Sequence, residues 1–172
     1  ADIAYGGVDQ RGIYMLGREI LPDHGWKSPV CIFAPLVSGL SGGKMSASEA
    51  GSKVALTDDR DAVVEKIQGA YCPAGEVEDN GVLEYLNHLV FPVLRERDDS
   101  VHVERPAEYG GDLVYETYED LEADFLEGEL HPADLKPAAG AAIDEVIAPV
   151  RERLTADPSL LAEAYPETYE DD

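Results

Sequence analysis

The stretch of sequence best suited to chemistry is the pentapeptide Lys44-Met45-Ser46-Ala47-Ser48. It lies in a segment rich in glycine and serine, from 37 to 53, which predicts a mobile polar loop. On such a loop an ammonium group neutralises the charge that develops on a transferring phosphate, while hydroxyls and backbone N–H groups hold the phosphate oxygens. The pentapeptide therefore predicts a polyphosphate-binding loop, with an ordinary surface loop as the alternative.

A second candidate segment, Gly6-Gly7-Val8-Asp9-Gln10-Arg11, comes about 35 residues earlier. Glycines at a turn let the backbone approach a ligand closely. Asp9 and Gln10 then stand at a helix start, where an acid and an amide suit a ribose hydroxyl and an α-amino group. Two alternatives stay open: Gln10 bonds its own backbone, and Arg11 is one partner of a surface ion pair.

The elements that must position these two segments form an α/β piece. Apolar residues at helical spacing between Gln10 and Leu21 predict a helix that Pro22 ends. The apolar run from Val30 to Leu36, bounded by prolines, predicts a buried strand. We expect no element before the glycine pair, so the chain reads as though it starts inside a fold.

From residue 57 onward the pattern becomes mostly helical. Helices are predicted over 57–69 and 80–94, from 117, and from 131, the last with Pro149 as a point where it can kink. Two short strands, 101–103 and 113–115, are predicted on either side of Tyr109-Gly110-Gly111. The tail from residue 155 is expected to be frayed.

The composition limits the classes of function. Among 172 residues, 36 are Asp or Glu and 13 are Lys or Arg, which gives a formal net charge of -23. This excludes a cationic nucleic-acid binder and a basic membrane-surface module. A hydrophobic content of 44% is ordinary for a folded protein, so disorder is not expected. An acid-rich, Lys-poor surface favours a cytoplasm with molar salt, where screening is strong; an acidic protein of an ordinary cell is the alternative.

The compartment follows from weaker signals. No apolar run approaches the ~18 residues of a membrane span, and no secretion signal is visible. The two cysteines, Cys31 and Cys72, fit reduced thiols in a cytoplasm. The four histidines have no spacing that would bind a metal, so no protein metal site is expected.

Several further segments accompany the two candidate segments in order along the chain. They read AYCPAGEVEDNG from Ala70, RPAEYGGDL from Arg105 and ELHPADLK from Glu129. Together with GGVDQRGIYMLGREIL from Gly6 and GLSGGKMSAS from Gly39, they resemble the tyrosyl-tRNA synthetases of archaeal and eukaryotic type, within class I of the aminoacyl-tRNA synthetases. The resemblance covers residues 4 to 154. Ala47 stands where the family's signature loop has a second lysine.

The resemblance implies an architecture. Residues 1–57 would be the C-terminal part of a Rossmann-type catalytic domain, and residues 58–172 a mainly α-helical anticodon-binding domain. The family's His-Ile-Gly-His-like motif is absent from this chain, which would therefore be the C-terminal portion of an enzyme and inactive alone. The implied partners are ATP with Mg²⁺ as substrate, L-tyrosine and tRNA(Tyr), in a cytoplasmic homodimer without a tightly bound cofactor.

The resemblance also implies roles for single residues near the reaction. Lys44, Ser46 and Ser48 would be catalytic and, with Met45 and Ala47, would close over the ATP phosphates. Gln10 would bind tyrosine, Asp9 the ribose, and Gly7 would line the same substrate site. Arg11 would lie near the first base pair of the acceptor stem. We expect the scarce cations Arg11, Lys44 and Lys136 to face substrates.

For the anticodon, the resemblance points to two aromatic rings and an acid. Tyr109 and His131 would sandwich a splayed-out base, and Asp134 would accept hydrogen bonds from a guanine. Pro132 and Lys136 would shape the site and contact the backbone. The alternatives are structural: Tyr109 in the core, His131 as a helix cap and Asp134 as a first-turn acid.

Three other functions remain alternatives to a tyrosine-specific ligase. The first is a tRNA anticodon-binding module without catalysis. The second is a fragment of a tryptophanyl-type synthetase, which shares a similar signature loop. The third is an acidic interaction protein, which only the net charge supports.

Overall fold

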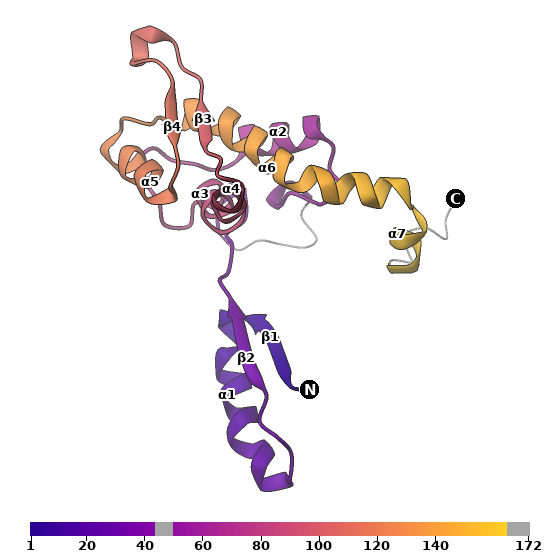
Figure 1. Cartoon of the computed structure of the whole chain (residues 1–172). Helices are drawn as coiled ribbons and strands as arrows, with labels where there is room; N and C mark the ends of the chain where they lie inside the picture. The colour runs from indigo at the N-terminus through magenta and orange to yellow at the C-terminus, as the bar shows by residue number, and fades with distance from the viewer. Residues whose placement is uncertain (44–49, 165–172) are drawn as a thin grey trace. The chain divides into compact units, whose positions relative to one another are not determined.

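The computed structural model describes residues 1–43 and 50–164, in two compact units (Figure 1). We call Ala1–Val37 the N-terminal unit and the part from Ser38 onward the C-terminal unit. The pentapeptide Lys44-Met45-Ser46-Ala47-Ser48 lies outside the described residues.

The N-terminal unit is a β-α-β arrangement. Strand β1 (Ile3–Gly7) leads through a 3-10 turn (Val8–Gln10) into helix α1 (Arg11–Ile20), which is followed by a second 3-10 turn and strand β2 (Val30–Ala34). The two strands are parallel, with Ile3 opposite Val30 and Gly7 opposite Ala34. The predicted helix, its end before Pro22 and the strand from Val30 are confirmed.

Strand β1 corrects the expectation that no element precedes the glycine pair. Gly6 and Gly7 belong to the strand itself. A glycine is needed at position 6 because Tyr14 of helix α1 packs closely against the strand there. A Cβ atom on Gly6 would lie 2.6 Å from the ring of Tyr14. The Tyr14 hydroxyl donates to the carbonyl of Tyr5 at 3.1 Å, and its ring centroid lies 5.6 Å from that of Phe33 on β2.

The prediction of a buried strand after Pro29 is wrong for this chain. Strand β2 ends at Ala34, and Val30 and Ile32 are 59% and 48% exposed. On helix α1, Ile13 and Leu16 are exposed as well. In the described part of the N-terminal unit these apolar side chains are therefore not buried by the two strands and one helix that carry them.

The C-terminal unit is built from helices and one hairpin. Its elements are α2 (Arg60–Gly69), α3 (Gly81–Tyr85), a π-helical turn (Leu86–Val90), α4 (Phe91–Arg97), β3 (Val101–Val103), β4 (Leu113–Tyr115), α5 (Tyr118–Glu127), α6 (Pro132–Ala156) and α7 (Ser159–Ala164). The predicted helices and the antiparallel hairpin are confirmed. Helix α7 corrects the expectation of a frayed tail as far as Ala164, and α6 is assigned as helix through both Pro137 and Pro149.

Side-chain caps explain where four of these helices begin. Asp59, Asn80, Thr117 and His131 each accept a hydrogen bond from a backbone N–H two or three residues ahead. Such a bond satisfies one of the donors that a helix start leaves unpaired. The caps therefore set the register of α2, α3, α5 and α6, and with it the position of every later side chain on each helix.

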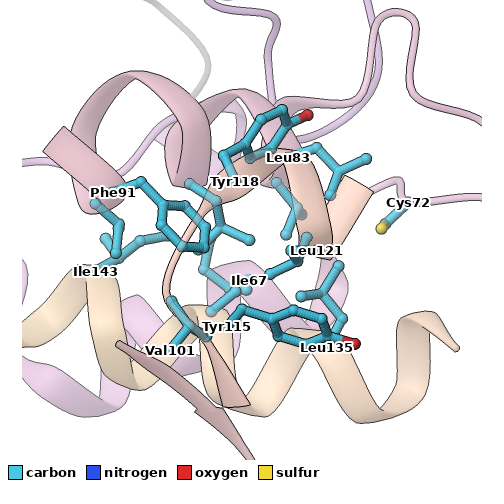
Figure 2. Packing of buried hydrophobic residues seen from close by; sticks show 14 of the residues in the cluster. Ile67, Cys72, Leu83, Phe91, Val101, Tyr115, Tyr118, Leu121, Leu135 and Ile143 are labelled. Carbon is cyan, nitrogen blue, oxygen red and sulfur yellow. The ribbon is translucent and has the colours of Figure 1, made fainter. Parts of the chain in front are cut away.

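The core of the C-terminal unit is continuous and apolar (Figure 2). Helix α6 packs against α2 and β3. The fully buried side chains of the core come from α2, α3, α5 and α6 and include Ile67, Leu83, Leu121, Phe125 and Leu135. Phe91 and Tyr118 meet edge to face at 6.0 Å between ring centroids. This packed core supports the segments that the C-terminal unit carries at its surface.

The compact boundary lies after Val37, ahead of the boundary at 57 that the sequence predicts between two functional domains. Ser38 explains the difference: its N–H and hydroxyl both donate to the carboxylate of Glu84, the latter at 3.0 Å. Leu40 is buried and donates to the carbonyl of Ser52 at 2.9 Å. The described residues of this stretch, 38–43 and 50–57, thus belong with the helices, and the functional domain boundary stays a prediction.

Replacing each of two glycines in this core by alanine is expected to change the stability in opposite directions. Gly140, inside α6, has room for a Cβ atom at 3.5 Å or more from Val64 and Ile67, so Gly140→Ala is expected to stabilise the chain by about 0.5–1 kcal/mol. At Gly81 a Cβ atom would lie 2.9 Å from the carbonyl oxygen of Ser38, so Gly81→Ala is expected to destabilise it. Chemical denaturation followed by far-UV circular dichroism measures both; shifts of equal sign would contradict this packing.

None of the helices within residues 1–43 and 50–164 has the length and apolar character needed to cross a bilayer.

Candidate functional site

The turn after strand β1 presents Asp9 and Gln10 at the start of helix α1. Both residues are exposed, and they follow the carboxyl end of a parallel strand, where ligands bind in open α/β sheets. A Cβ atom on Gly7 would lie 2.5 Å from Oδ1 of Asp9, so a larger residue would have to displace that carboxylate from its present position. The three predicted substrate residues are therefore brought together on one turn.

The structural alternative for Gln10 is wrong. Gln10 is the N-cap residue of α1 but makes no side-chain capping hydrogen bond. Arg11 is exposed, and no ion pair among the described residues includes it. Neither side chain is thus occupied by the structural role that the sequence left open for it.

Backbone hydrogen bonds join the described residues on the two sides of the signature pentapeptide. Gly39 donates to the carbonyl of Gly43 at 2.7 Å, and Leu40 donates to Ser52. Further along, the N–H of Val54 donates to the hydroxyl of Tyr85 at 3.3 Å. The segments that flank the pentapeptide are therefore held against helix α3.

Tyr109 stands on a tight turn in the β3–β4 connection and is 65% exposed, so the core alternative is wrong. It ends a 3-10 turn, and the next two residues, Gly110 and Gly111, have φ values of 100° and 79°. This left-handed conformation favours glycine. The N–H groups of Tyr109 and Gly111 both donate to the carbonyl of Pro106, at 2.9 and 3.3 Å.

His131 is a helix cap, as its structural alternative proposed, and it is exposed at the same time. Nδ1 accepts from the N–H of Ala133 at 3.1 Å, which requires the ring proton on Nε2. Pro132 is buried as the first residue of α6, and Asp134 follows in the first turn with a partly exposed side chain. The cap therefore fixes the orientation of the His131 ring instead of hiding it.

Lys136 has a structural contact that the sequence analysis missed. Its ammonium group donates to the carbonyl oxygens of Gln68 and Ala70, at 3.2 and 2.6 Å. These carbonyls lie at the end of α2, where helix termination leaves acceptors unpaired. The ammonium is thus directed at the protein backbone rather than at a substrate surface, and a contact with tRNA stays a prediction.

Arg105 is the other residue whose place the sequence did not reveal. Its Nε donates to the carbonyl of Gly111 at 2.8 Å, and its Nη1 donates to that of Glu129 at 2.7 Å. The first acceptor belongs to the turn of Tyr109 and the second to the segment that leads into His131. The only sequence signal was its position at the head of the motif RPAEYGGDL.

Cys72 is a free, buried cysteine that is poorly suited to nucleophilic chemistry. Burial raises the pKa of the Cys72 thiol, whose sulfur lies 3.4 Å from the amide nitrogen of Asn80. A raised pKa keeps the group protonated and unreactive at neutral pH. Within residues 1–43 and 50–164, no group of three His, Cys, Asp or Glu side chains is arranged to hold a metal ion.

Comparison with known proteins identifies the family. A family model described as "tRNA synthetases class I (W and Y)" matches residues 1–148. The chain belongs to this family. The chain is 75% identical over 170 residues to a tyrosine–tRNA ligase of Natronomonas pharaonis and 74% identical over 169 residues to that of Haloarcula marismortui. These matches cover 99% and 98% of this synthetase chain but 49% of each relative.

Solved structures agree with these relatives. The chain matches a tyrosyl-tRNA synthetase of Archaeoglobus fulgidus, crystallised with L-tyrosine, with a TM-score of 0.80 and 44% identity over 90% of this chain and 47% of that one. The resemblance predicted from the motifs is confirmed, and the two closely similar ligases come from halophilic archaea, as the acidic composition predicted. A tryptophanyl-tRNA synthetase of Giardia lamblia, 22% identical, shares the fold with a TM-score of 0.62. The chain spans about half the length of the curated relatives it matches.

Proposed function

We propose that this synthetase chain is part of a tyrosine–tRNA ligase, which joins L-tyrosine to tRNA(Tyr) at the expense of ATP. The observation that carries the proposal is the 75% identity to the Natronomonas pharaonis ligase across 99% of the chain. A tryptophanyl-type enzyme is disfavoured because the Giardia lamblia tryptophanyl-tRNA synthetase is 22% identical to the chain, against 44% for the Archaeoglobus fulgidus tyrosyl-tRNA synthetase.

The proposed reaction has two steps. A carboxylate oxygen of tyrosine attacks the α-phosphorus of ATP, and the bond to the β-phosphate breaks, releasing pyrophosphate. A hydroxyl of the terminal tRNA ribose then attacks the carbonyl carbon of tyrosyl-adenylate, and AMP leaves. ATP would enter with Mg²⁺ as part of the substrate. Positioning and charge stabilisation dominate such chemistry.

The N-terminal unit would supply substrate contacts in the first step. Gln10, which caps nothing, is available for the tyrosine amino group, and Asp9 for the ribose. Arg11 would reach the acceptor stem. Lys44, Ser46 and Ser48 would stabilise the phosphates during transfer.

The C-terminal unit would read the anticodon. Tyr109 and His131 each present an exposed ring from a rigidly bonded turn or cap, so a splayed-out base can stack on them. The carboxylate of Asp134, three residues beyond His131, would accept from the N–H donors of a guanine edge. The wider arrangement that we propose is a catalytic domain to residue 57 followed by this anticodon-binding domain, in a cytoplasmic homodimer.

Asp134 gives the direct test. A fusion that places the unmatched half of the Natronomonas pharaonis ligase ahead of Ala1 provides a full-length enzyme, called the fusion enzyme below. In it, Asp134→Ala is expected to lower kcat/KM for tRNA charging by about 10- to 100-fold, the effect of about 1–3 kcal/mol in stacking and base-edge contacts. Tyrosine-dependent ATP–pyrophosphate exchange should not change, because that step needs no tRNA.

The matched control is Asp61→Ala, which removes another acid from a first helical turn, that of α2. It should leave charging and exchange alike unaltered. If Asp134→Ala lowers charging and exchange equally, Asp134 is structural. A fusion enzyme that shows no exchange activity, while still binding tRNA, would favour the non-catalytic module.

A further inference from the structure

One arginine ties together the two elements that carry the exposed rings. The guanidinium of Arg105 donates from Nε to the carbonyl of Gly111 and from Nη1 to that of Glu129, at 2.8 and 2.7 Å. Gly111 lies two residues after Tyr109, and Glu129 lies two residues before His131. A single planar group therefore sets how far the turn of Tyr109 can move from the start of helix α6.

The turn itself is built to keep this guanidinium in place. The backbone N–H of Arg105 donates to Oδ1 of Asp112 at 3.0 Å, which closes the turn at its base. Gly110 adopts a φ of 100°, and a Cβ atom there would lie 3.1 Å from Nη2 of Arg105. A side chain at position 110 would therefore be strained and would press on the guanidinium.

Arg105 bonds neutral carbonyls although acidic residues are abundant around it in the sequence. The C-terminal unit holds 32 acidic and 10 basic residues, yet Arg105 forms no ion pair among the described residues. Its two side-chain acceptors are neutral carbonyls. Arginine differs from lysine in offering several donors in a rigid fork, whereas lysine offers a point charge. The contacts of Arg105 therefore depend more on the planar, forked shape of its guanidinium than on its charge.

We propose that Arg105 is a positioning residue of the anticodon-binding site: it holds the turn of Tyr109 and the cap of His131 in a fixed relation, so that one base can stack on both rings. The proposal rests on the proposed function. Because the rings are held before the tRNA arrives, less conformational entropy is lost on binding.

The test compares Arg105→Lys and Arg105→Met in the fusion enzyme. Both are expected to lower kcat/KM for tRNA by about tenfold, since neither side chain can donate to two separate carbonyls in a fixed plane. Pyrophosphate exchange should stay unchanged. Arg97→Lys is the matched control, because Arg97 is an exposed partner of Glu145 at 3.5 Å. If lysine at position 105 preserves charging and methionine abolishes it, Arg105 acts as a cation toward the tRNA and the proposal fails.

A double-mutant cycle with Tyr109→Ala separates positioning from a general loss of stability. Tyr109→Ala alone should lower charging by about tenfold or more, and Arg105→Lys should then add less than about twofold. Effects that simply multiply would overturn the proposal. If Tyr109→Ala and His131→Ala both charge normally, the anticodon contacts of the proposed function are themselves wrong, which is a separate outcome.

A second variant covers the case in which the Arg105 variants fail to fold. Gly110→Ala keeps Arg105 but crowds its guanidinium, and it should reproduce the tenfold loss in charging with exchange unchanged. Normal charging by a folded Gly110→Ala variant, with the same melting temperature as the parent enzyme, would contradict the proposed spacing role.

Discussion

Replacing Lys44 by alanine in the fusion enzyme is expected to lower the rate of tyrosine-dependent ATP–pyrophosphate exchange by about 100- to 1,000-fold. An ammonium group placed on the phosphates gains most of its stabilising energy as charge develops in the transition state. The loss should therefore appear in the rate of adenylation and leave the affinity for tyrosine nearly unchanged. Ser46→Ala and Ser48→Ala, which remove neutral donors, should cost less.

Steady-state exchange at varied tyrosine and ATP concentrations measures this effect. Lys27→Ala is the control: it removes the same charge from the surface, where Lys27 pairs with Asp2 at 3.6 Å and both side chains are more than 80% exposed. It should leave exchange unaltered. A Lys44→Ala enzyme with a normal rate constant and a weakened affinity for tyrosine would contradict a role on the phosphates.

Most of the helices could be predicted because local chemistry determines them. Asp59, Asn80 and Thr117 are residues that cap helices well, and each is followed by apolar residues at helical spacing. The hairpin strands were predicted with their observed bounds, since Gly110 and Gly111 mark the turn between two short apolar runs. In these segments the signal lies within a few residues of the element it predicts.

Strand β1 needed information that is not local, whereas the π-helical turn has a local cause. A parallel strand is stabilised by its partner, and for Ile3 the partner is Val30, 27 residues away. The glycines that the strand requires for the approach of Tyr14 look, in the sequence, like a turn. In the π-helical turn, Pro92 has no N–H to offer the carbonyl of His88, so the regular α pattern cannot continue there.

The candidate site was predicted in its residue types but not in its supporting contacts. The rings of Tyr109 and His131 are exposed as expected, but the bonds of Arg105 and Lys136 reach carbonyls 6 to 68 residues away. No spacing rule connects such positions. For His131 the sequence offered a helix cap and an exposed ring as alternatives. The structure shows both at once, because the ring caps helix α6 and remains exposed.

The distribution of charge sharpens what the acidic composition means for tRNA. The N-terminal unit carries four acidic and three basic residues, so 22 of the 23 net negative charges fall on the C-terminal unit, which would read the anticodon. Several of its cations are engaged internally: Lys66, Arg97 and Arg151 pair with acids, and Lys136 and Arg105 bond carbonyls. If this unit reads the anticodon as proposed, phosphate neutralisation would contribute little, and stacking with base-edge contacts would have to supply the specificity.

Arg151→Met is expected to lower the free energy of unfolding of the C-terminal unit by about 3 kcal/mol. Arg151 donates to Oδ1 of Asp144 at 2.8 Å and to the carbonyl of Asp58 at 2.9 Å. Asp144 is buried, with 12% of its side chain exposed, so the variant leaves a carboxylate without its partner in an apolar core. Asp58 in turn pairs with Lys66, and the loss thus also loosens the segment that leads into α2.

The neighbouring residue on α6 supplies the control. Glu145 pairs with Arg97 at 3.5 Å, but the two side chains are 63% and 42% exposed, so Arg97→Met should cost less than about 1 kcal/mol. High salt should abolish the stability loss of Arg97→Met and leave that of Arg151→Met, because buried ion pairs are screened less than exposed ones. Adding Asp144→Leu to Arg151→Met should restore most of the stability by removing the unpaired charge.

The two units allow the measurement to be assigned within one chain. Trp26, the single tryptophan, lies in the N-terminal unit, whereas helices α2 to α7 lie in the C-terminal unit. Denaturation of Arg151→Met should shift the transition seen by circular dichroism and leave the transition in Trp26 fluorescence in place. Equal losses for Arg151→Met and Arg97→Met, or no recovery in the double variant, would show that Asp144 is as well solvated as Glu145. The stabilising role would then belong to the apolar contacts around α6, since the ion pair would add no more than a surface pair does.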